Sequence, residues 1–577
     1  MKYFLASLML LVSSSGLAQS LADLLPAESF LVLGASDVAA HEEKLEPFIA
    51  EFERLDLGTA LIAAFAADTD GATGADASED AEPVITELDE RLESLKLLDI
   101  IGQDAWIALS ASSFNPLPAL TLIATVSPEA STAVSELIAE LENLETLEEN
   151  GYTFYQQRLE GADSLVQVLA FAQDGDTLML SSNPDTLRGV LRQLSGSSDP
   201  SFTAGEGYGA SLGSLGDANF TGYLDFSQVV NVLQPYAQGF GFDQLIERVA
   251  QALDTAGVTA GALRVTDEGL ESESRQILNP AGGDAELIAL LSGDGAAADT
   301  LSAAPVDALS ASTAALDLSA WWDYLNGISA SSPELGGDLD SLAELFLGVD
   351  VRTTLLSWLG GNVTTISTGL GEVAEPGVAS SNLLGESVYI LATDDEAAAV
   401  TGLNTLFSTA GTALSGFTDP SGTGSAVEPS VSQIAGLDVS TYAFSDGIEL
   451  SYAVADGQVY IATTQDALST VLASEGAFSD VPEVAALLAD VPGDASSISL
   501  TNNRETLAGT ANQIASQIQM TAGIGGASQL DFDAVDEASV KLEEFLSFVA
   551  ERLGYSSSYS QSADNQVSGF SKTTVNW

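Results

Sequence analysis

Histidine and cysteine, which often act as nucleophiles, bases or zinc ligands, are almost absent from this sequence. It contains one histidine, His41, and no cysteine. Zinc sites, Cys-His dyads and iron sites with two histidines are therefore excluded, and a Ser-His-Asp triad would need His41 itself. The segment after His41 has a helical pattern whose apolar residues turn inward: Leu45, Ile49, Phe52 and Leu55. His41 lies among glutamates at the start of this pattern, so we expect it on the surface.

Carboxylates are the remaining groups that could do acid-base chemistry, and they are very abundant. The chain has 83 Asp and Glu residues, so neighbouring pairs such as Asp394-Asp395 and Glu148-Glu149 carry little information. A glycosidase could use two of them, but no aromatic-flanked pair stands out. The stretch Asp68-Thr69-Asp70-Gly71 resembles the middle of a calcium loop, yet Ala66 and Ala77 occupy positions that require oxygen ligands. We therefore expect only weak, nonspecific cation binding.

Two clusters of other residue types are candidate ligand sites. The glycines of Gly205–Gly209 do not complete a dinucleotide fingerprint, and no GxxxxGK phosphate loop exists, so we interpret them as turn residues. Trp321 and Trp322, with Tyr324, could form an aromatic platform for a ligand, but we favour core packing at a helix start. The sequence therefore predicts no catalytic, cofactor-binding or metal-binding residue, and no cofactor.

The elements that would position any site alternate between helical and strand periods. Ser127 and Asn183, each followed by proline, are helix N-cap candidates. Thr153–Leu159 and Leu165–Leu180 have strand-like patterns, with turns at Glu160-Gly161 and Asp174-Gly175. Strands joined by short turns pair antiparallel. The expected fold class is therefore α+β, with helices covering one face of a largely antiparallel sheet.

Self-comparison indicates that the chain contains two copies of one module. Five segments of the first half resemble segments of the second half in one linear order. The matches are Ile101-Gly102 with Leu359-Gly360, Thr121–Leu137 with Val388–Leu403, Asp176–Leu191 with Gly457–Leu472, Gly216–Ala218 with Gly493–Ala495, and Arg264–Leu278 with Ser560–Trp577. The shared positions are mostly apolar. The only functional groups shared at matched positions are the carboxylates of the pairs Asp185/Asp466 and Asp217/Asp494. We interpret these as helix-start and turn residues.

These matches set the expected domain boundaries. Residues 1–18 form a signal peptide, residues 20–280 module one, residues 281–304 a linker rich in Gly, Ala and Asp, and residues 305–577 module two. Two low-complexity insertions, Ala66–Pro83 and Phe417–Pro429, are expected to be surface loops.

The N-terminus and the charge indicate export. Lys2 precedes an apolar run from Phe4 to Val12 and small residues that end at Ala18, as in a secretory signal peptide. No later run is long enough for a transmembrane helix. The net charge of −67, from 16 Lys and Arg against 83 Asp and Glu, repels phosphate backbones, so we expect no nucleic-acid binding. Such acidity also suggests a salt-rich habitat, or the ordinary acidity of a secreted protein.

The order of these features resembles a bacterial family known as domain of unknown function 3352. The resemblance rests on the signal peptide, Leu25–Val38, the strand after Ile101-Gly102, the step from strand to helix at Ala124–Ala130, and the helix at Asn183–Leu191. It implies an exported two-repeat protein and carries no activity or site residues. Module two departs from the pattern at its start, after Ala304-Pro305.

From the sequence we expect a non-catalytic binding or interaction protein of the cell envelope, the periplasm or the secreted fraction. Its partner, a protein or a small molecule, would bind along or between the two modules, where a cleft is the natural site. The first alternative is a carboxylate-based extracytoplasmic hydrolase. A second alternative is an outer-membrane barrel, because Val575 and Trp577 alternate with polar neighbours at the C-terminus.

Overall fold

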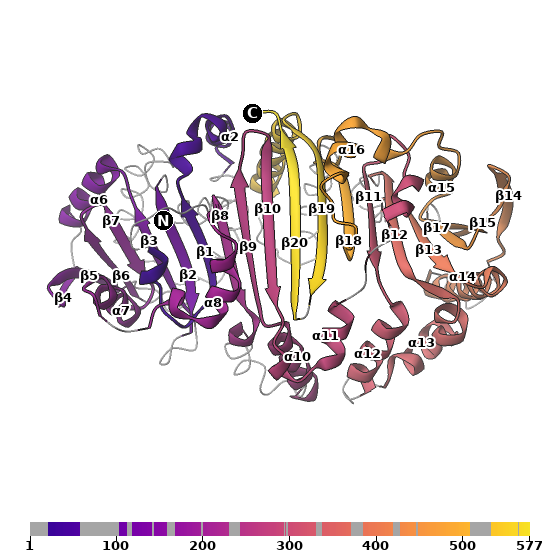
Figure 1. The fold of residues 1–577 in the computed structure, drawn as a ribbon, viewed down its shortest axis with the longest axis horizontal. Helices are drawn as coiled ribbons and strands as arrows, with labels where there is room; N and C mark the ends of the chain where they lie inside the picture. Colours follow the sequence, from indigo (N-terminus) through magenta and orange to yellow (C-terminus); the bar gives the residue numbers. More distant parts are fainter. Residues whose placement is uncertain are drawn as a thin grey trace.

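The computed structural model shows one body in which helices surround a single large sheet (Figure 1). The structure describes residues 21–57, 103–111, 118–140, 144–158, 168–197, 200–229, 243–292, 295, 298–330, 337–370, 385–418, 427–445, 448–507, 532–563 and 565–577. The expected mixture of helices with a large antiparallel sheet is confirmed.

All described strands belong to one twenty-stranded sheet, where the sequence predicted a separate sheet in each module. The first half of the chain supplies β1 (Ser29–Ser36), β2 (Asp104–Ser110), β3 (Ala119–Thr125), β4 (Glu145–Glu149), β5 (Tyr152–Arg158), β6 (Val168–Asp174), β7 (Thr177–Ser181), β8 (Phe220–Asp225), β9 (Val258–Val265) and β10 (Gly269–Ile277). The second half supplies β11 (Ser310–Ala315), β12 (Leu359–Gly369), β13 (Glu386–Thr393), β14 (Ser430–Ile434), β15 (Leu437–Ser445), β16 (Ile448–Ala455), β17 (Gln458–Ala462), β18 (Ser497–Asn502), β19 (Leu553–Ala563) and β20 (Gln566–Val575). Every pairing between them is antiparallel.

Strand order is the same on the two sides of the sheet's centre. The order across the sheet is β4-β5-β6-β7-β3-β2-β1-β8-β9-β10-β20-β19-β18-β11-β12-β13-β17-β16-β15-β14. Segments that resemble each other in sequence also have matching registers: Thr121 pairs with Ser181, and their counterparts Val388 and Ala462 pair with each other. An isolated bridge precedes each half, Pro26 with Ser201 and Pro305 with Ala477.

Helices α6 (Pro128–Glu140) and α7 (Pro184–Leu194) begin where the sequence predicts them. The Ser127 hydroxyl accepts a hydrogen bond from the Ala130 N–H at 3.2 Å, and the Asn183 side chain accepts one from the Asp185 N–H at 2.9 Å. Both residues therefore act as N-caps. The expected turn at Asp174-Gly175 joins β6 to β7, whereas Glu160-Gly161 lies outside the described residues.

The other helices lie along both faces of the sheet and at its ends (Figure 1). They are α2 (Glu42–Arg54), α8 (Glu206–Ala210), α10 (Asp243–Ala256), α11 (Ala285–Leu291), α12 (Leu318–Ala330), α13 (Leu339–Leu347), α14 (Glu396–Thr418), α15 (Gln465–Leu472), α16 (Pro482–Leu488) and α18 (Phe532–Ala550). Short 3-10 helices include η1 (Leu21–Leu24), η2 (Val38–His41), η3 (Phe202–Ala204), η4 (Leu212–Ser214), η6 (Ala298–Ala303) and η9 (Phe478–Asp480). None of the helices in the described ranges combines the length and apolar character that a membrane crossing requires.

The expectation that helices cover one face of the sheet is wrong. In β3, Ile123 packs into a core that contains Leu187 of α7, whereas its neighbour Leu122 packs on the opposite face against Ala130 of α6. Successive strand residues point to opposite faces, so both faces are covered. The physical cause is that β3 is an almost continuous apolar run, so it has no polar face to turn toward solvent. We call the face that carries α7, α8, α15 and α16 the first face, and the opposite one the second face.

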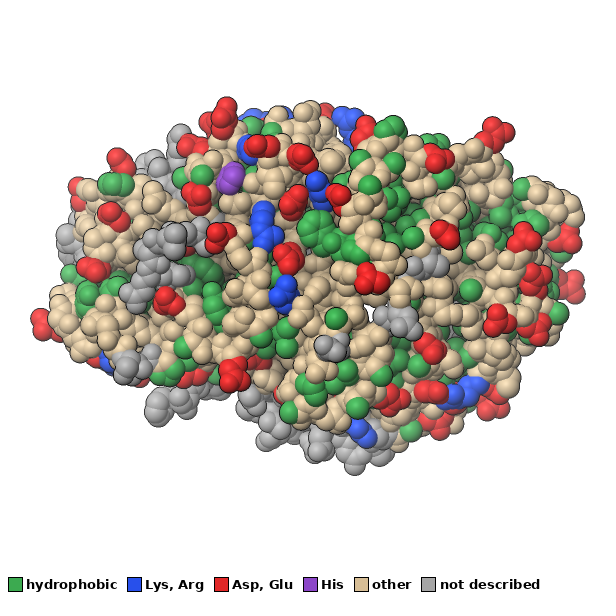
Figure 2. All heavy atoms as spheres, viewed as in Figure 1, with side chains coloured by type: hydrophobic (Ala, Val, Ile, Leu, Met, Phe, Trp, Pro, Cys, Tyr) green, Lys and Arg blue, Asp and Glu red, His purple; other side chains and the backbone are tan. Residues whose placement is uncertain are grey.

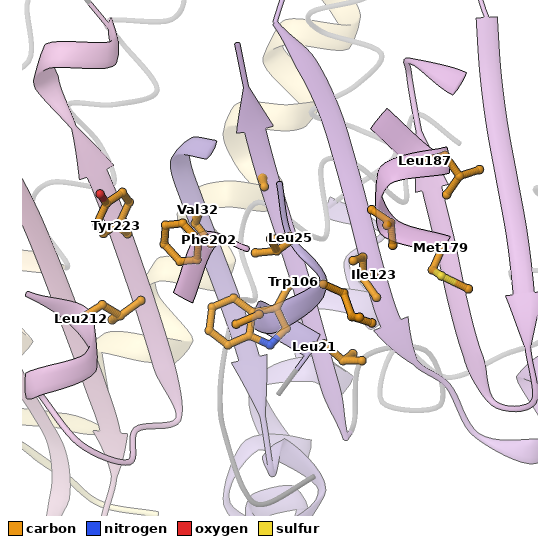
Figure 3. Packing of buried hydrophobic residues seen from close by; sticks show 14 of the residues in the cluster. Leu21, Leu25, Val32, Trp106, Ile123, Met179, Leu187, Phe202, Leu212 and Tyr223 are labelled. Carbon is orange, nitrogen blue, oxygen red and sulfur yellow. The ribbon is translucent and has the colours of Figure 1, made fainter. Parts of the chain in front are cut away.

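The largest core of the first half lies on the first face (Figure 3). It begins with Leu21 and Leu25, which follow the expected signal peptide directly, and it continues through Trp106 to Tyr223. The Trp106 ring lies over Gly34, where an added Cβ would stand 2.4 Å from the indole Cζ3. A side chain at Gly34 would therefore displace this ring.

The expected linker includes α11 and η6, which pack onto the body. Asp284 caps α11 by accepting a hydrogen bond from the Leu287 N–H at 3.0 Å. Leu301 of η6 and the following Ala304 are buried in the core of the second half. The last part of the linker segment thus contributes to that core.

Candidate functional site

The single histidine lies at the entrance of a helix. His41 is half-buried, ends η2 and precedes the first residue of α2. Its neighbour Lys44 donates to Asp267 Oδ1 at 2.7 Å and to the Thr266 carbonyl oxygen at 3.0 Å. The contact of this segment with the β9–β10 turn is therefore made by Lys44.

The neighbouring carboxylates singled out in the sequence serve local structural roles. Asp395 caps α14, because its Oδ1 accepts a hydrogen bond from the Ala398 N–H at 3.0 Å, while Asp394 is exposed. Glu149 lies 3.5 Å from Arg192, whereas Glu148 is exposed. The calcium-like stretch Asp68–Gly71 lies outside the described residues.

The aromatic residues Trp321, Trp322 and Tyr324 connect helices. Trp322 Nε1 donates to Asp340 Oδ1 of α13 at 2.8 Å, and the Tyr324 hydroxyl donates to Asp284 Oδ2, before α11, at 2.8 Å. Trp321 packs edge-on against Tyr324, with ring centroids 6.1 Å apart. These side chains join α11, α12 and α13 and form no open platform of stacked rings. Of the glycines at 205–209, Gly205 precedes α8 and the others lie in it.

The repeated aspartates hold corresponding turns. Asp217 and Asp494 each lie before a central strand, β8 or β18. Arg264 of β9 donates to the Asp217 carbonyl oxygen at 2.8 Å, and Gln561 of β19 donates to Asp494 Oδ1 at 2.7 Å. The two halves thus secure the same turn from the neighbouring strand with different side chains.

The expected boundary between the halves is a strand pairing. β10 and β20 pair along nine residues, from Gly269–Thr574 to Ile277–Gln566. On the second face the hydroxyls of Ser272 and Ser571, which are direct partners, lie 2.8 Å apart. The sheet is therefore continuous where the sequence analysis placed a cleft between two modules.

We call the pairing of β10 with β20 the joint. On its first face, acidic and basic side chains alternate across the two strands. Glu271, Glu273 and Arg275 of β10 face the same side, and Lys572 of β20 lies opposite Glu271. Lys572 contacts Glu268 at 2.9 Å and Glu271 at 3.6 Å, so this ion pair crosses from one half to the other. Figure 2 shows such basic and acidic side chains together near the middle of the visible surface.

The two arginines of the joint are held in place by neighbouring groups. Arg264 Nη1 and Arg275 Nη2 lie 3.5 and 3.3 Å from the carboxylate of Glu273. Arg275 Nη1 also donates to the Ser214 hydroxyl at 2.6 Å, whereas its buried Nε has no hydrogen-bond partner among the described residues. Both arginines therefore tie the loop around η4 to the sheet.

The charges around the joint favour the ionised form of its lysine and the neutral form of its tyrosine. The hydrogen bond with Glu268 raises the pKa of Lys572, with support from Glu271 and Asp490. Burial raises the pKa of Tyr559, and the carboxylates of Glu273 and Asp490 add to this effect. At neutral pH the joint thus holds paired charges and a neutral phenol, an arrangement suited to holding strands together.

A carboxyl away from the joint has an unusual environment. Burial raises the pKa of Asp104 at the start of β2. Its carboxylate accepts hydrogen bonds from Ser36 Oγ and Trp106 Nε1, both 3.0 Å from Oδ1, and from the Leu21 N–H. These hydrogen bonds lower the pKa but do not cancel the effect of burial. Asp104 therefore fastens Leu21 to the sheet.

The contacts at the joint could not be found by motif search. Strands β10 and β20 both belong to a matched pair of C-terminal hairpins, and this match was visible in the sequence. The sequence does not show that β10 and β20, the last strands of the two halves, pair with each other. The alternation of apolar and polar residues along an edge strand does not specify which strand it pairs with.

Comparison with known proteins gives no family. No family model matches the chain, and no curated protein matches it. Two crystal structures are similar over part of the chain. Crystal form III of TP0453 is 12% identical with a TM-score of 0.24 and covers 48% of this chain and 87% of its own. Crystal form I is 10% identical with a TM-score of 0.22 and covers 46% and 80%. Scores this low support no conclusion on fold or function.

Proposed function

We propose that this chain is an exported, non-catalytic binding or interaction protein made of two copies of one module. It acts outside the cytoplasm as a rigid body that presents the parts of its sheet that the helices leave open. Its resemblance in sequence to domain-of-unknown-function family 3352 agrees with this proposal. The ligand or partner protein contacts such an open part of the sheet, because a continuous strand ladder joins the two halves where a hinged cleft would lie.

The observation that carries the proposal is the continuous ladder between β10 and β20. Binding proteins that close on a ligand have hinges between their halves. Here nine residue pairs and the Lys572–Glu271 contact connect the halves, so relative motion would break a strand ladder. A rigid scaffold is suited to holding a partner on a preformed surface.

The repeat of strand order and register supports the duplication. Thr121–Ser181 and Val388–Ala462 are equivalent in the sequence matches and are pairs in the sheet. At the same time the charged side chains of the joint are not repeated, since Arg264 and Glu273 correspond to Gln561 and Phe570. This difference is expected if the duplicated part is the scaffold.

The hydrolase alternative has one observation in its favour. Glu271 and Glu273 lie on the same face of β10, and two nearby carboxylates are what acid-base hydrolysis uses. Arg264 and Arg275 both contact the Glu273 carboxylate, however, so this group is already held in ion pairs within the protein.

The experiment that tests the proposal measures export and catalysis on the same preparation. The full chain is expressed in a Gram-negative host, and the N-terminus of the fractionated protein is sequenced. The mature protein is then incubated with chromogenic glycosides, esters and peptides beside Glu271→Gln and Glu273→Gln variants. We expect removal of residues 1–18 and no turnover above buffer. Turnover that either variant abolishes would establish the hydrolase instead.

A further inference from the structure

Serine and threonine side chains occupy part of the second face of the sheet in the C-terminal half. Ile498 and Leu500 of β18 point into the core on the first face, so the residues that alternate with them point to the second. The residues that share this side on β12, β11, β18 and β19 are Thr365, Ser367, Ser310, Ser312, Ser497, Ser499, Thr501, Ser556, Ser558 and Ser560. We call this set the hydroxyl face.

These hydroxyls are accessible and few of them are paired. Each residue of the hydroxyl face is partly exposed. The Ser497 and Ser560 hydroxyls lie 2.6 Å apart, and Ser556 Oγ donates to Asn503 Oδ1 at 3.4 Å. Over the part of the chain that the structure describes, the other side-chain hydroxyls of the set form no hydrogen bond. They include the neighbouring row Thr365, Ser312 and Ser499. Such groups are available to water or to a ligand.

Two residues of the adjacent strand β13 point to a ligand. Ser387, the partner of Ser367, is only 9% exposed, and its hydroxyl forms no hydrogen bond with a described residue. A hydroxyl in this position can form a hydrogen bond with a group that approaches from the open side. Tyr389, the partner of Thr365, is 37% exposed and presents an aromatic ring beside the hydroxyls.

The N-terminal half provides an internal comparison. In the same strand order, the row Ser367–Ser310–Thr501 corresponds to Leu109–Leu31–Leu224. Likewise, Thr365 and Ser312 correspond to Ile107 and Leu33, and the pair Ser497–Ser560 corresponds to Phe220–Leu263. The fold therefore does not require hydroxyls at these positions, because apolar side chains occupy them in the other half.

We propose that the hydroxyl face, with Ser387 and Tyr389, binds a neutral carbohydrate. None of its residues is charged, although the chain carries 83 acidic residues, and the surrounding negative field disfavours anionic ligands. Hydroxyls on neighbouring strands stand about 4.8 Å apart, so several can donate to and accept from one sugar chain. The Tyr389 ring provides an apolar surface on which a sugar ring packs.

The test is a titration of the mature protein with cellohexaose, maltohexaose and chitohexaose, monitored by calorimetry and by saturation-transfer NMR. We expect one of the three to bind. The triple variant Thr365→Ala, Ser312→Ala, Ser499→Ala should weaken this binding about tenfold or more, since it removes hydrogen bonds while keeping each Cβ. Tyr389→Ala should weaken it as well, whereas Tyr389→Phe should retain most of it.

The matched control is Ser430→Ala with Ser432→Ala in β14, which lies at the far edge of the same sheet. It should change the dissociation constant less than twofold. Thermal melting verifies that every variant remains folded. The proposal is overturned if none of the three oligosaccharides binds the folded protein, or if binding is equal in the triple variant and the control. Neither result bears on export or on the absence of turnover, which are measured separately.

Discussion

At the scale of single residues, Asp104 shows how one buried carboxyl organises the N-terminus. It accepts hydrogen bonds from Ser36, Trp106 and the Leu21 N–H, and so joins η1 to β1 and β2. Because burial raises the pKa of Asp104, its ionisation costs the folded state free energy. The protein retains the carboxylate because removing it would leave buried donors unpaired.

Replacement of Asp104 should separate these two effects. The folded pKa is raised, so the wild type loses stability as the pH rises from the ordinary aspartate value through the folded value. Asp104→Asn keeps an acceptor oxygen but cannot ionise. Its free energy of unfolding relative to the wild type should therefore increase between pH 3.5 and pH 7, as measured by urea denaturation. A difference independent of pH would contradict the raised pKa.

Asp104→Ala is the companion to that variant. It leaves Trp106 Nε1 and Ser36 Oγ without their acceptor, and we expect a loss of about 1–3 kcal/mol at pH 7. An alanine variant as stable as the asparagine variant would show that these hydrogen bonds do not stabilise the fold.

Capping residues were the most predictable at this scale. Ser127 and Asn183 were identified as N-caps from sequence because a cap needs only a local pattern. The partners of Arg264 and Lys572 were not predicted, since they come from segments distant in the chain.

At the scale of elements, the C-terminal residue packs against helix α2. Trp577 donates from Nε1 to the Thr266 carbonyl oxygen at 3.0 Å and packs edge-on against Phe48 of α2, with ring centroids 6.1 Å apart. Phe48 also contacts Phe548 of α18. One aromatic cluster thus joins helices from the two halves of the chain.

Trp577→Ala should lower the free energy of unfolding by about 1–2 kcal/mol, because it removes an aromatic contact and one hydrogen bond. Trp577→Phe keeps the ring contact, so its loss should be smaller. Chemical denaturation of the three proteins provides the measurement. Equal stability of the alanine variant and the wild type would show that the C-terminus does not fasten α2.

The elements themselves were predicted better than their arrangement. The helices at α6 and α7 and the hairpin of β6 and β7 follow from periodicity and turn residues. The second covered face was missed because Leu122 and Ile123 are both apolar and both buried, so β3 shows no alternation.

At the scale of the whole molecule, the net charge of −67 dominates. The chain has 16 basic residues, and several of them, including Arg264, Arg275 and Lys572, are used at the joint between the halves. Repulsion among the remaining acidic groups opposes folding. Added salt weakens this repulsion, because the Debye length falls from about 10 Å at 0.1 M to about 3 Å at 1 M.

We therefore expect the melting temperature to rise as sodium chloride increases from 0.1 to 2 M. Differential scanning calorimetry at constant pH measures this directly, and a chain of similar size with balanced charge serves as the control. A melting temperature that stays constant or falls would remove the idea that this protein is adapted to salt.

The sequence predicted two modules with a sheet each, whereas the structure has a single sheet whose two halves share one strand order. Segments that resemble each other in sequence, such as Thr121–Leu137 and Val388–Leu403, begin in corresponding strands of that order. The β10–β20 pairing depends on two edge strands that each look complete within their own hairpin, so nothing local specifies it.

The continuity of this sheet is the central claim, and one crosslink tests it. The chain has no cysteine, so Ser272→Cys with Ser571→Cys creates the only pair of thiols. Directly opposed residues of antiparallel strands have Cα atoms about 4.5–5.5 Å apart, within the range of disulfides. Ser272→Cys with Ser568→Cys is the control, because Ser568 points to the opposite face.

On mild oxidation, mass spectrometry should show a complete disulfide between residues 272 and 571, with the melting temperature maintained or raised. The control pair should remain reduced. If instead both thiols of the first pair stay free and react with a maleimide while the protein is folded, the two halves are not joined through β10 and β20.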